Sequence, residues 1–373
     1  MADQTQSRTA PIILRAVRIW SGLYLLAFVA SHLTNLSFGL ISIEAMDAAR
    51  PYVTGIWTGA ITGTILMAAL LAHFILGLWA LYVRPTLRTN AQDIVQLVTG
   101  LLVVPLLATH AIGISMAANS GLHFGYMDTI RLFWLFSPGI GLLQVTLIAV
   151  VWVHGCAGLF TWLRSKENAG RILRWLYVAA VAVPILALLG YAEAGREMLQ
   201  ANATGGEIAQ MPPIPEDVTV PFALIKQVTN WVIYGSALLA IFTLVARQIR
   251  VTLQPSQKVA LIRDDSDEMA SNSTITLLDG FRQNDQPHAS LCEGRGRCGT
   301  CAVRIIHTEF PLSKPSELEQ RTLTRVKAPP GARLACQVKA AGGKVTVAAL
   351  YPADYTFEDS RPTAKSTPEE APA

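Results

Sequence analysis

The chain has 373 residues, of which 51% are hydrophobic and 15% are charged, and its formal net charge at pH 7 is +4. Soluble globular chains carry roughly a quarter charged residues, so this composition argues against a wholly soluble protein, and the apolar excess lies almost entirely before Arg250. The sequence has no basic stripe with interleaved aromatic residues, which argues against a nucleic-acid partner.

Six apolar segments are long enough to cross a hydrocarbon core of about 30 Å, which takes about 20 helical residues. We predict membrane-spanning helices over residues 15–41, 54–83, 93–118, 138–163, 172–194 and 224–248. The first segment is too long for a signal-peptide core and lacks a clean cleavage site, so we expect it to remain in the mature protein. The longest connection, about 195–223, is rich in Gly and Pro and predicts an irregular loop.

Lys and Arg residues are distributed unequally between the two sides of these segments. The richer side contains Arg8, Arg15, Arg18, Arg84, Arg88, Arg164, Lys166, Arg171, Arg174, Arg247, Arg250, Lys258 and Arg263. The poorer side contains Arg50, Arg131, Arg196 and Lys226. Because the basic side of a membrane protein is cytoplasmic, we predict a multi-pass protein of the bacterial inner membrane with both termini in the cytoplasm.

From Lys258 onward the pattern becomes that of a small soluble domain. Short β-like runs at 258–263, 302–306, 333–338 and 344–350 alternate with helical stretches at 276–285 and 315–326. The last residues are low in hydrophobicity and predict a disordered tail. We therefore expect a membrane domain over 1–250, a linker over 251–257, a soluble domain over 258–356 and a tail over 357–373, with no internal repeat of the solenoid type.

The soluble domain contains four cysteines, three of them in a Cys-x5-Cys-x2-Cys loop and one 35 residues later: Cys292, Cys298, Cys301 and Cys336. Four thiolates bind a [2Fe–2S] cluster, and glycines within such a loop let backbone N–H groups face the sulfurs. Disulfides are an alternative that a cytoplasmic location disfavours. A zinc site is a second alternative, although zinc ribbons usually show two matched Cys-x2-Cys pairs.

At these residues the chain resembles the ferredoxin superfamily over about 258–352, and its Cys-x5-Cys spacing is similar to that of the adrenodoxin type. The resemblance implies a β-grasp α+β fold and a [2Fe–2S] cluster bound by Cys292, Cys298, Cys301 and Cys336. We expect Gly294, Gly296 and Gly299 to supply the backbone freedom of the loop. His288 is expected to be an exposed loop residue, with tuning of the cluster potential as the alternative, and His307 is expected at the surface.

The first four predicted spans each contain one histidine: His32, His73, His110 and His154. A titratable ring is costly in hydrocarbon, so a histidine there suggests function. The helix rise of about 1.5 Å per residue puts His32 and His110 in the outer half of the bilayer and the other two in the inner half. Two bis-imidazole haems at two depths would need this arrangement. Hydrogen-bonded structural histidines and a proton relay are the alternatives, and the spans lack Asp or Glu partners for a relay.

Two other membrane-part residues are expected to have no cofactor role. His123 lies in an outer connection and is predicted to be interfacial, and Cys156 is predicted to be small apolar filler.

Around the four histidines, and in segments such as RIWSGLYLLAFVASH, the first five spans resemble the dihaem cytochrome b anchors of succinate:quinone oxidoreductases. The resemblance implies an all-α bundle that binds two haem b groups, one between His32 and His110 and one between His73 and His154, with a quinone as the membrane partner. The chain departs from that enzyme family because it lacks the cysteines for additional clusters.

The whole layout resembles the membrane and regulatory part of a group of bacterial class III adenylate cyclases, in which a dihaem anchor and a ferredoxin precede a cyclase domain. The resemblance implies electron exchange among quinol, haems and cluster, used as a redox sensor. Since no cyclase domain follows the ferredoxin, we expect any nucleotide chemistry on another chain and no catalytic domain in this one. A respiratory carrier that serves a soluble partner and a purely structural anchor are the alternatives.

Overall fold

The computed structural model describes residues 2–164, 169–206, 210, 214, 218–264, 266–355 and 359, with the side chains of 2–12 and 169–171 outside the description. The chain forms two compact units. The first comprises Met1–Val83, Ala91–Leu159 and Trp175–Gln248, and the second comprises Arg84–Asn90, Phe160–Arg174 and Ile249–Ala373. The predicted tail over 357–373 lies outside the described residues except for Asp359, and the predicted domain boundaries stay a prediction.

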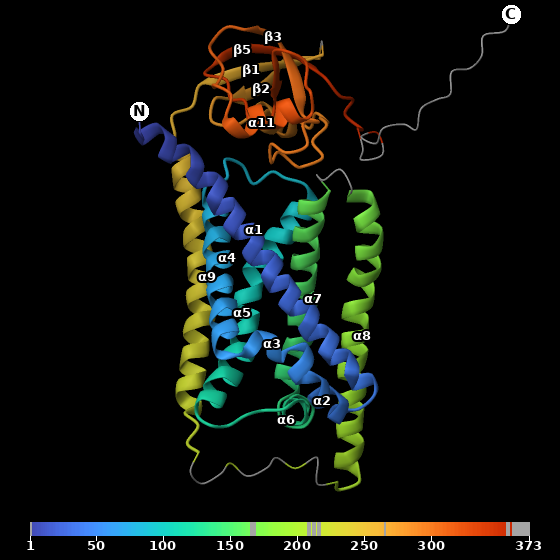
Figure 1. Cartoon of the computed structure of the whole chain (residues 1–373). Coiled ribbons are helices and arrows are strands. Elements are labelled where there is room, and N and C mark those ends of the chain that lie inside the picture. The colour runs from blue at the N-terminus through green and yellow to red at the C-terminus, as the bar shows by residue number, and fades with distance from the viewer. Residues whose placement is uncertain are drawn as a thin grey trace, which may run out of the picture. The chain divides into compact units, whose positions relative to one another are not determined.

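Six long helices dominate the first unit (Figure 1): α1 (Ala2–Ser37), α4 (Ala60–Tyr82), α5 (Ala91–Asn119), α7 (Pro138–Leu163), α8 (Ala169–Ala203) and α9 (Phe222–Leu253). Each contains a stretch long and apolar enough to cross a membrane. Large apolar side chains along them are exposed, among them Leu142, Trp231 and Phe242 at 64–69%. Such surfaces suit lipid contact, and the prediction of a multi-pass membrane protein is confirmed at this level.

Short helices occupy the connections that were predicted as loops or span ends: η1 (Phe38–Leu40), α2 (Ile43–Val53), α3 (Gly55–Thr58), α6 (Tyr126–Arg131) and the π-helical turn η2 (Leu132–Phe136). The prediction of one span over 54–83 is wrong at its start. Gly59 adopts an extended conformation with ψ 163° and separates α3 from α4. Hydropathy does not detect this break because the residues on both sides of it are apolar.

The prediction of an irregular loop from residue 195 is also wrong over its first part, since α8 continues to Ala203. The segment EAGREMLQANA is too polar to extend an apolar span, but Ala, Glu, Met, Leu and Gln are strong helix formers. In the rest of that predicted loop, residues 207–209, 211–213 and 215–217 lie outside the described residues.

A tight crossing between α1–η1 and α8 anchors the core of the first unit. A Cβ at Gly190 would lie 2.2 Å from the carbonyl oxygen of Leu36, and a Cβ at Gly39 would lie 2.3 Å from the carbonyl oxygen of Gly190. Small residues let helix backbones approach closely in this way. Around the crossing, Leu33 and Met198 are buried.

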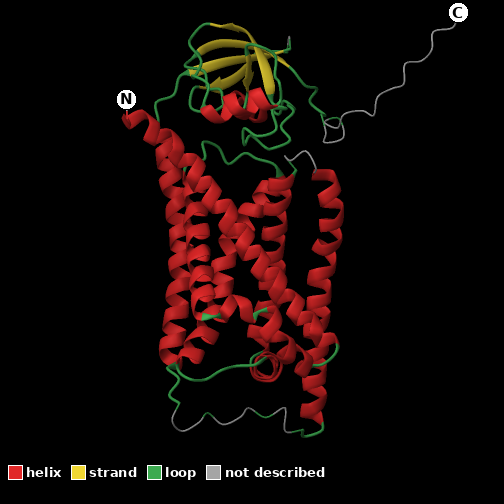
Figure 2. Ribbon diagram, viewed as in Figure 1, coloured by secondary structure: helices red, strands yellow, loops and turns green. Residues whose placement is uncertain are grey.

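Among its described residues from Lys258 onward, the second unit has a five-stranded sheet with two short helices (Figure 2). In chain order the elements are β1 (Lys258–Arg263), β2 (Met269–Asn272), α10 (Leu277–Gln283), β3 (Ala302–Thr308), α11 (Glu317–Arg325), β4 (Ala332–Leu334) and β5 (Gly343–Ala349). The sheet order is β2-β1-β5-β3-β4, with β1 and β5 parallel and the other pairs antiparallel. Its core includes Leu261, Phe281, Val303, Leu334 and Val345, each fully buried.

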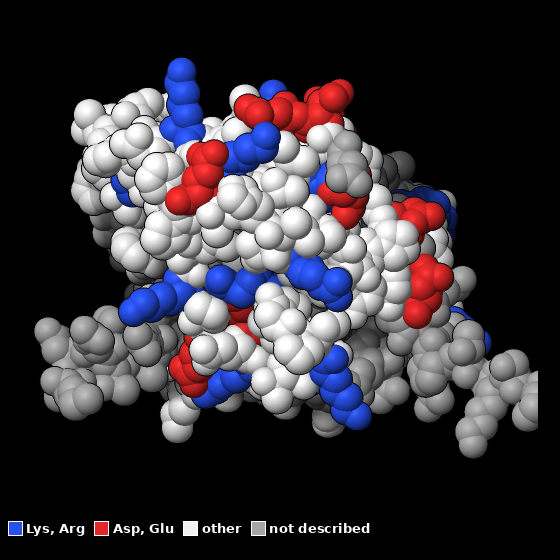
Figure 3. Space-filling model, turned by 90° about the horizontal axis from the view of Figure 1, so that it is seen from above, with Lys and Arg blue, Asp and Glu red and all other residues white. Residues whose placement is uncertain are grey.

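These elements confirm the predicted fold class, six long apolar helices followed by a small mixed-sheet domain. The predicted strand over 333–338 is wrong beyond Leu334. The N–H groups of Gln337 and Val338 both donate to the Leu334 carbonyl at 2.7 and 3.1 Å, so the chain turns there and Cys336 lies in the turn. On the face seen in Figure 3, positive and negative side chains are interspersed among uncharged ones, as on a water-exposed surface.

Candidate functional site

The loop between α10 and β3 carries three of the four clustered cysteines and depends on unusual backbone angles. Gly294, Gly296 and Gly299 have φ of +80°, +63° and +83°, as predicted. A Cβ at Gly299 would also lie 2.9 Å from both γ-carbons of Val326. Glu293 adopts φ +54° although it is not a glycine, and sequence analysis gave no signal for that position.

The four cysteines lie in two pairs. The backbone N–H of Cys292 donates to Cys298 Sγ at 3.4 Å, and Cys301 Sγ lies 3.2 Å from Cys336 Sγ. All four are free thiols, and Cys292, Cys301 and Cys336 are at most 5% exposed. The loop therefore brings together the four cysteines that the sequence singled out, two and two.

Local donors favour the thiolate at Cys292. A hydrogen bond from the Cys298 thiol, together with the backbone N–H of Arg297 at 3.4 Å from Cys292 Sγ, holds the pKa of Cys292 well below its ordinary value. Thiolate is the form of cysteine that binds iron. The hydrogen bond to Cys336 and burial raise the pKa of Cys301, and a bound cation would favour the ionised form of that thiol.

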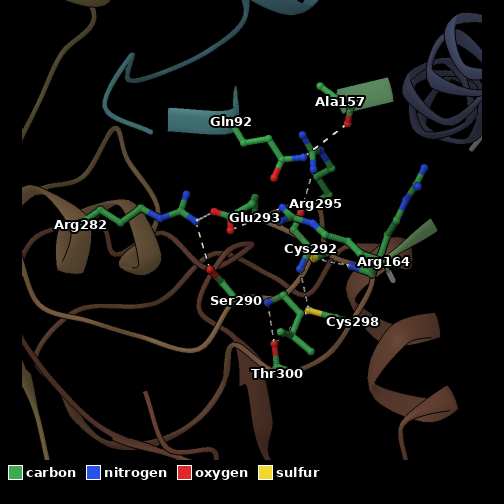
Figure 4. A network of polar contacts seen from close by, with 12 residues as sticks. Gln92, Ala157, Arg164, Arg282, Ser290, Cys292, Glu293, Arg295, Cys298 and Thr300 are labelled. Carbon is green, nitrogen blue, oxygen red and sulfur yellow. Dashed lines mark hydrogen bonds and ion pairs between the residues drawn. The ribbon is translucent and has the colours of Figure 1, made fainter. Parts of the chain in front are cut away.

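Side chains around the loop hold its shape (Figure 4). The Leu291 N–H donates to Thr300 Oγ1 at 3.1 Å, and the Thr300 hydroxyl lies 3.1 Å from Cys298 Sγ. Arg282 on α10 donates to Ser290 Oγ at 3.1 Å and to a Glu293 carboxylate oxygen at 2.6 Å. Sequence analysis missed these positioning residues, because the link from α10 to the loop becomes visible only when the chain is folded.

A buried ion pair anchors the turn that carries Cys336. Glu319 on α11 is fully buried and accepts from Arg333 Nε at 2.9 Å and from the Leu334 backbone N–H at 2.8 Å. Since Leu334 ends β4 two residues before Cys336, this pair fixes the position from which the fourth cysteine approaches the loop.

The expectation that His288 is exposed is wrong. Its ring packs on Phe281 with centroids 4.8 Å apart, and Nε2 lies 3.4 Å from the carbonyl oxygen of Cys301. Burial lowers the pKa of His288 to about 4. The contact was missed because Phe281 belongs to α10 and meets His288 only through the tertiary fold. His307 on β3 is exposed, as predicted.

In the first unit the four histidines of the spans also lie in two pairs. The rings of His32 and His110 have centroids 5.9 Å apart, and those of His73 and His154 are 6.1 Å apart. We call these the outer pair and the inner pair, after the depths expected from the sequence. Their four helices, α1, α5, α4 and α7, each supply one ring.

The spacing of both pairs, and the environment of the inner pair, fit haem iron between the rings. Two imidazoles that bind one metal ion in line, at about 2.0 Å each, have centroids about 6 Å apart. In the inner pair, Nδ1 of each ring lies 3.0 Å from a backbone carbonyl oxygen, that of Arg18 for His73 and that of Gln96 for His154. Metal-binding histidines are usually held in this way through the nitrogen that does not face the metal.

In the outer pair, His110 Nδ1 is buried and has no hydrogen-bond partner among the described residues. A buried polar atom normally has a partner, so this nitrogen is free to serve as a ligand or donor. Across the described part of the chain, no three His, Cys, Asp or Glu side chains converge on one metal position. Haem iron bound by two imidazoles and cluster iron bound by two thiolates need only pairs.

The remaining residues that the sequence singled out lie apart from these pairs. His123 is exposed in the connection between α5 and α6. Cys156 is half-buried in α7 and packs against the core of the first unit. Both placements agree with the roles predicted for them.

Comparison with known proteins identifies the second unit. Residues 262–341 match the family model of the 2Fe-2S iron-sulfur cluster binding domain, and this match includes all four cysteines of the loop and turn. No solved structure matches the chain. The chain thus has six apolar helices followed by a 2Fe-2S domain, and the match supports a [2Fe–2S] cluster, over the zinc alternative, and iron–sulfur electron transfer.

Proposed function

We propose that the protein exchanges electrons between a membrane quinone, two b-type haems in the helical unit and a [2Fe–2S] cluster on the cytoplasmic side of a bacterial inner membrane, and that it acts as a redox sensor. The observation that carries the proposal is the occurrence, in one chain, of two imidazole pairs at haem-like spacing and a 2Fe-2S domain. When bound, such groups each take up and release single electrons.

Cys292 and Cys298 are proposed to bind one iron, and Cys301 and Cys336 the other, because these are the pairs that lie together. The chain prepares the site in two ways. The loop aims the backbone N–H groups of Cys292 and Arg297 at sulfur, which stabilises negative charge there. The apolar surroundings of the buried thiols exclude water, which strengthens those interactions.

His32 with His110 and His73 with His154 are proposed as the axial ligands of the two haems. A haem iron held by two such imidazoles would have no site left for O₂ and would be suited to electron transfer. The carbonyl groups of Arg18 and Gln96 fix the inner rings, so that Nε2 of each is the nitrogen left for the metal.

The quinone, the cytoplasmic termini and the sensor role rest on the basic-residue distribution and on the two family resemblances. A sensor needs a partner whose state follows its own, and a cyclase on a separate chain is the partner that the second resemblance implies. The competing function is a respiratory carrier, which would pass electrons onward continuously.

The experiment is spectroscopy of the full-length protein, purified after expression with added haem precursor and iron. We expect b-type optical bands with bis-histidine EPR signals and, on reduction, the rhombic EPR signal of a [2Fe–2S] cluster. His110→Ala is expected to lose the outer haem and His73→Ala the inner haem, with His123→Ala as an exposed control that loses neither. A wild-type protein that contains the cluster but no haem would contradict the haem proposal.

Addition of a short-chain ubiquinol tests whether quinol delivers electrons to the haems and the cluster. Reduction of both the haem bands and the cluster signal is expected. Sustained reduction of a soluble acceptor such as cytochrome c would support the carrier, whereas reduction to a fixed end point would support the sensor. No reduction of either centre by any quinol would exclude a quinone as partner.

A further inference from the structure

The two helices that supply the outer pair share a short sequence pattern. Ser21-Gly22-Leu23 precedes Ser31-His32 in α1, and Thr99-Gly100-Leu101 precedes Thr109-His110 in α5, so that a Ser/Thr-Gly-Leu motif and a Ser/Thr-His motif occur at the same spacing. The helices that supply the inner pair share another pattern. His73 is followed by Gly77-Leu78 in α4, and His154 is followed by Gly158-Leu159 in α7, again at the same spacing.

The contacts that His73 makes with α1 are matched by the contacts that His154 makes with α5. His73 Nδ1 lies 3.0 Å from the carbonyl oxygen of the residue four before Gly22, and His154 Nδ1 lies 3.0 Å from the carbonyl oxygen of the residue four before Gly100. A Cβ at Gly22 would lie 2.6 Å from His73 Cε1, and a Cβ at Gly100 would lie 2.6 Å from His154 Cε1.

We infer that α1 with α4 and α5 with α7 are two copies of one structural unit, and that Gly22 and Gly100 are equivalent positioning residues for the inner imidazole pair. Each copy supplies one ring to the outer pair and one ring to the inner pair, so both pairs lie between the copies. The inference rests on the proposed haem function, and it assigns that function two further residues that ligand spacing alone does not reveal.

The physical reason for glycine is the geometry of the carbonyl contact. In a helix the carbonyl oxygen of one residue accepts from the N–H four residues later, so the oxygens of Arg18 and Gln96 lie beneath Gly22 and Gly100. A ring that reaches such an oxygen must pass over the later residue. Because a side chain there would meet the ring at 2.6 Å, well inside van der Waals contact, only glycine lets the imidazole approach.

Each copy also has a hydroxyl next to this glycine. The Ser21 hydroxyl donates to the Arg18 carbonyl at 3.1 Å and lies 3.3 Å from His73 Nδ1. The Thr99 hydroxyl donates to the Val95 carbonyl at 2.6 Å and also lies 3.4 Å from the Gln96 carbonyl oxygen. In both copies, therefore, the carbonyl that faces the inner ring also has the hydroxyl of the residue before the glycine near it. This agreement is independent of the glycine–ring contact and supports the equivalence.

The outer pair does not repeat this arrangement. His110 Nδ1 has no partner among the described residues, and a Cβ at the nearby Gly113 would meet nothing within 4 Å. Gly22 and Gly100 therefore position the inner pair, and their substitution is expected to impair haem binding at the inner pair and to leave the outer pair intact.

The test uses the full-length protein with Gly22→Ala and Gly100→Ala, measured by haem content, low-temperature optical bands and EPR. Each variant is expected to halve the haem content and to lose the same haem signal that His73→Ala loses, while the signal lost in His110→Ala persists. Gly235→Ala in α9 is the matched control, because a Cβ there, unlike one at Gly22 or Gly100, would meet nothing within 4 Å. Retention of both wild-type haem signals in either glycine variant, or loss of the outer signal alone, would overturn the inference.

A second measurement covers variants that fail to accumulate in the membrane. Removal of the ring removes the clash, so Gly22→Ala/His73→Ala is expected to accumulate and melt like His73→Ala, and Gly100→Ala/His154→Ala like His154→Ala. If the double variants are as defective as the glycine variants, the clash is not with the ring and the inference is wrong. A wild-type protein without haem would instead refute the proposed function, and the melting comparison would still decide the positioning role.

Discussion

Thr300 allows a test of how a neighbouring hydroxyl influences the midpoint potential of the proposed cluster. Its hydroxyl lies 3.1 Å from Cys298 Sγ, and its oxygen accepts from the Leu291 N–H. A Cys298 thiolate has no proton to give, so the Thr300 hydroxyl would be the donor to a cluster-bound sulfur. A donor to a ligand sulfur stabilises the extra negative charge of the reduced state. Thr300→Val keeps the shape of the side chain and removes that donor.

One hydrogen bond contributes about 1 kcal/mol net, which for one electron corresponds to roughly 40 mV on the scale of 59 mV per tenfold change. We therefore expect Thr300→Val to lower the midpoint potential of the cluster by about 40 mV. The variant also leaves the Leu291 N–H without its acceptor, which is expected to destabilise the second unit by about 1–3 kcal/mol.

The assay is a redox titration of the full-length protein followed by the EPR signal of the reduced cluster. Thr300→Ser is the matched control because it retains the hydroxyl, and its potential is expected to stay within about 10 mV of the wild-type value. If Thr300→Val leaves the potential unchanged or raises it, or if Thr300→Ser shifts it equally, the hydroxyl does not act on the sulfur and the reasoning is refuted.

Two stability predictions concern the same unit and are read from thermal bleaching of the cluster. Glu319→Ala leaves the Arg333 guanidinium and the Leu334 N–H without their acceptor. We expect it to lower the free energy of unfolding by about 3 kcal/mol, or the melting temperature by more than about 10 °C in a domain of this size. Glu317→Ala, in an exposed pair on the same helix, is expected to cost under about 1 kcal/mol, and equal losses would show that burial of the pair is unimportant. Gly299→Ala is expected to destabilise more than Gly331→Ala, because both have φ near +80° but only the first would place a Cβ against Val326. Val326→Ala should rescue part of the Gly299→Ala loss and none of the Gly331→Ala loss, and rescue of both would contradict the assignment.

Features that depend on neighbours in sequence were predictable. The six spans follow from apolar length, and three of the four cysteines share one loop whose glycines signal its positive φ values. The strand β2 was missed because MASN has little β-propensity, and as an edge strand of four residues it pairs only with β1. The burial of His288 was missed because it depends on Phe281, which approaches from another element.

The duplicated helix pairs show why hydropathy conceals some relationships that coordinates reveal. Most positions on a spanning helix face lipid or apolar neighbours, and any apolar residue serves there, so two copies of a helix can diverge freely at those positions. The positions that remain alike include those with a steric or hydrogen-bonding reason to do so: the histidines, the glycines under the inner rings, and the small hydroxyl residues beside them. They are few in each helix and are separated by variable apolar residues, so they add almost nothing to a window average. Because the inner pair takes one ring from each copy, alanine at either glycine displaces one of its two rings, and the intact glycine of the other copy cannot compensate.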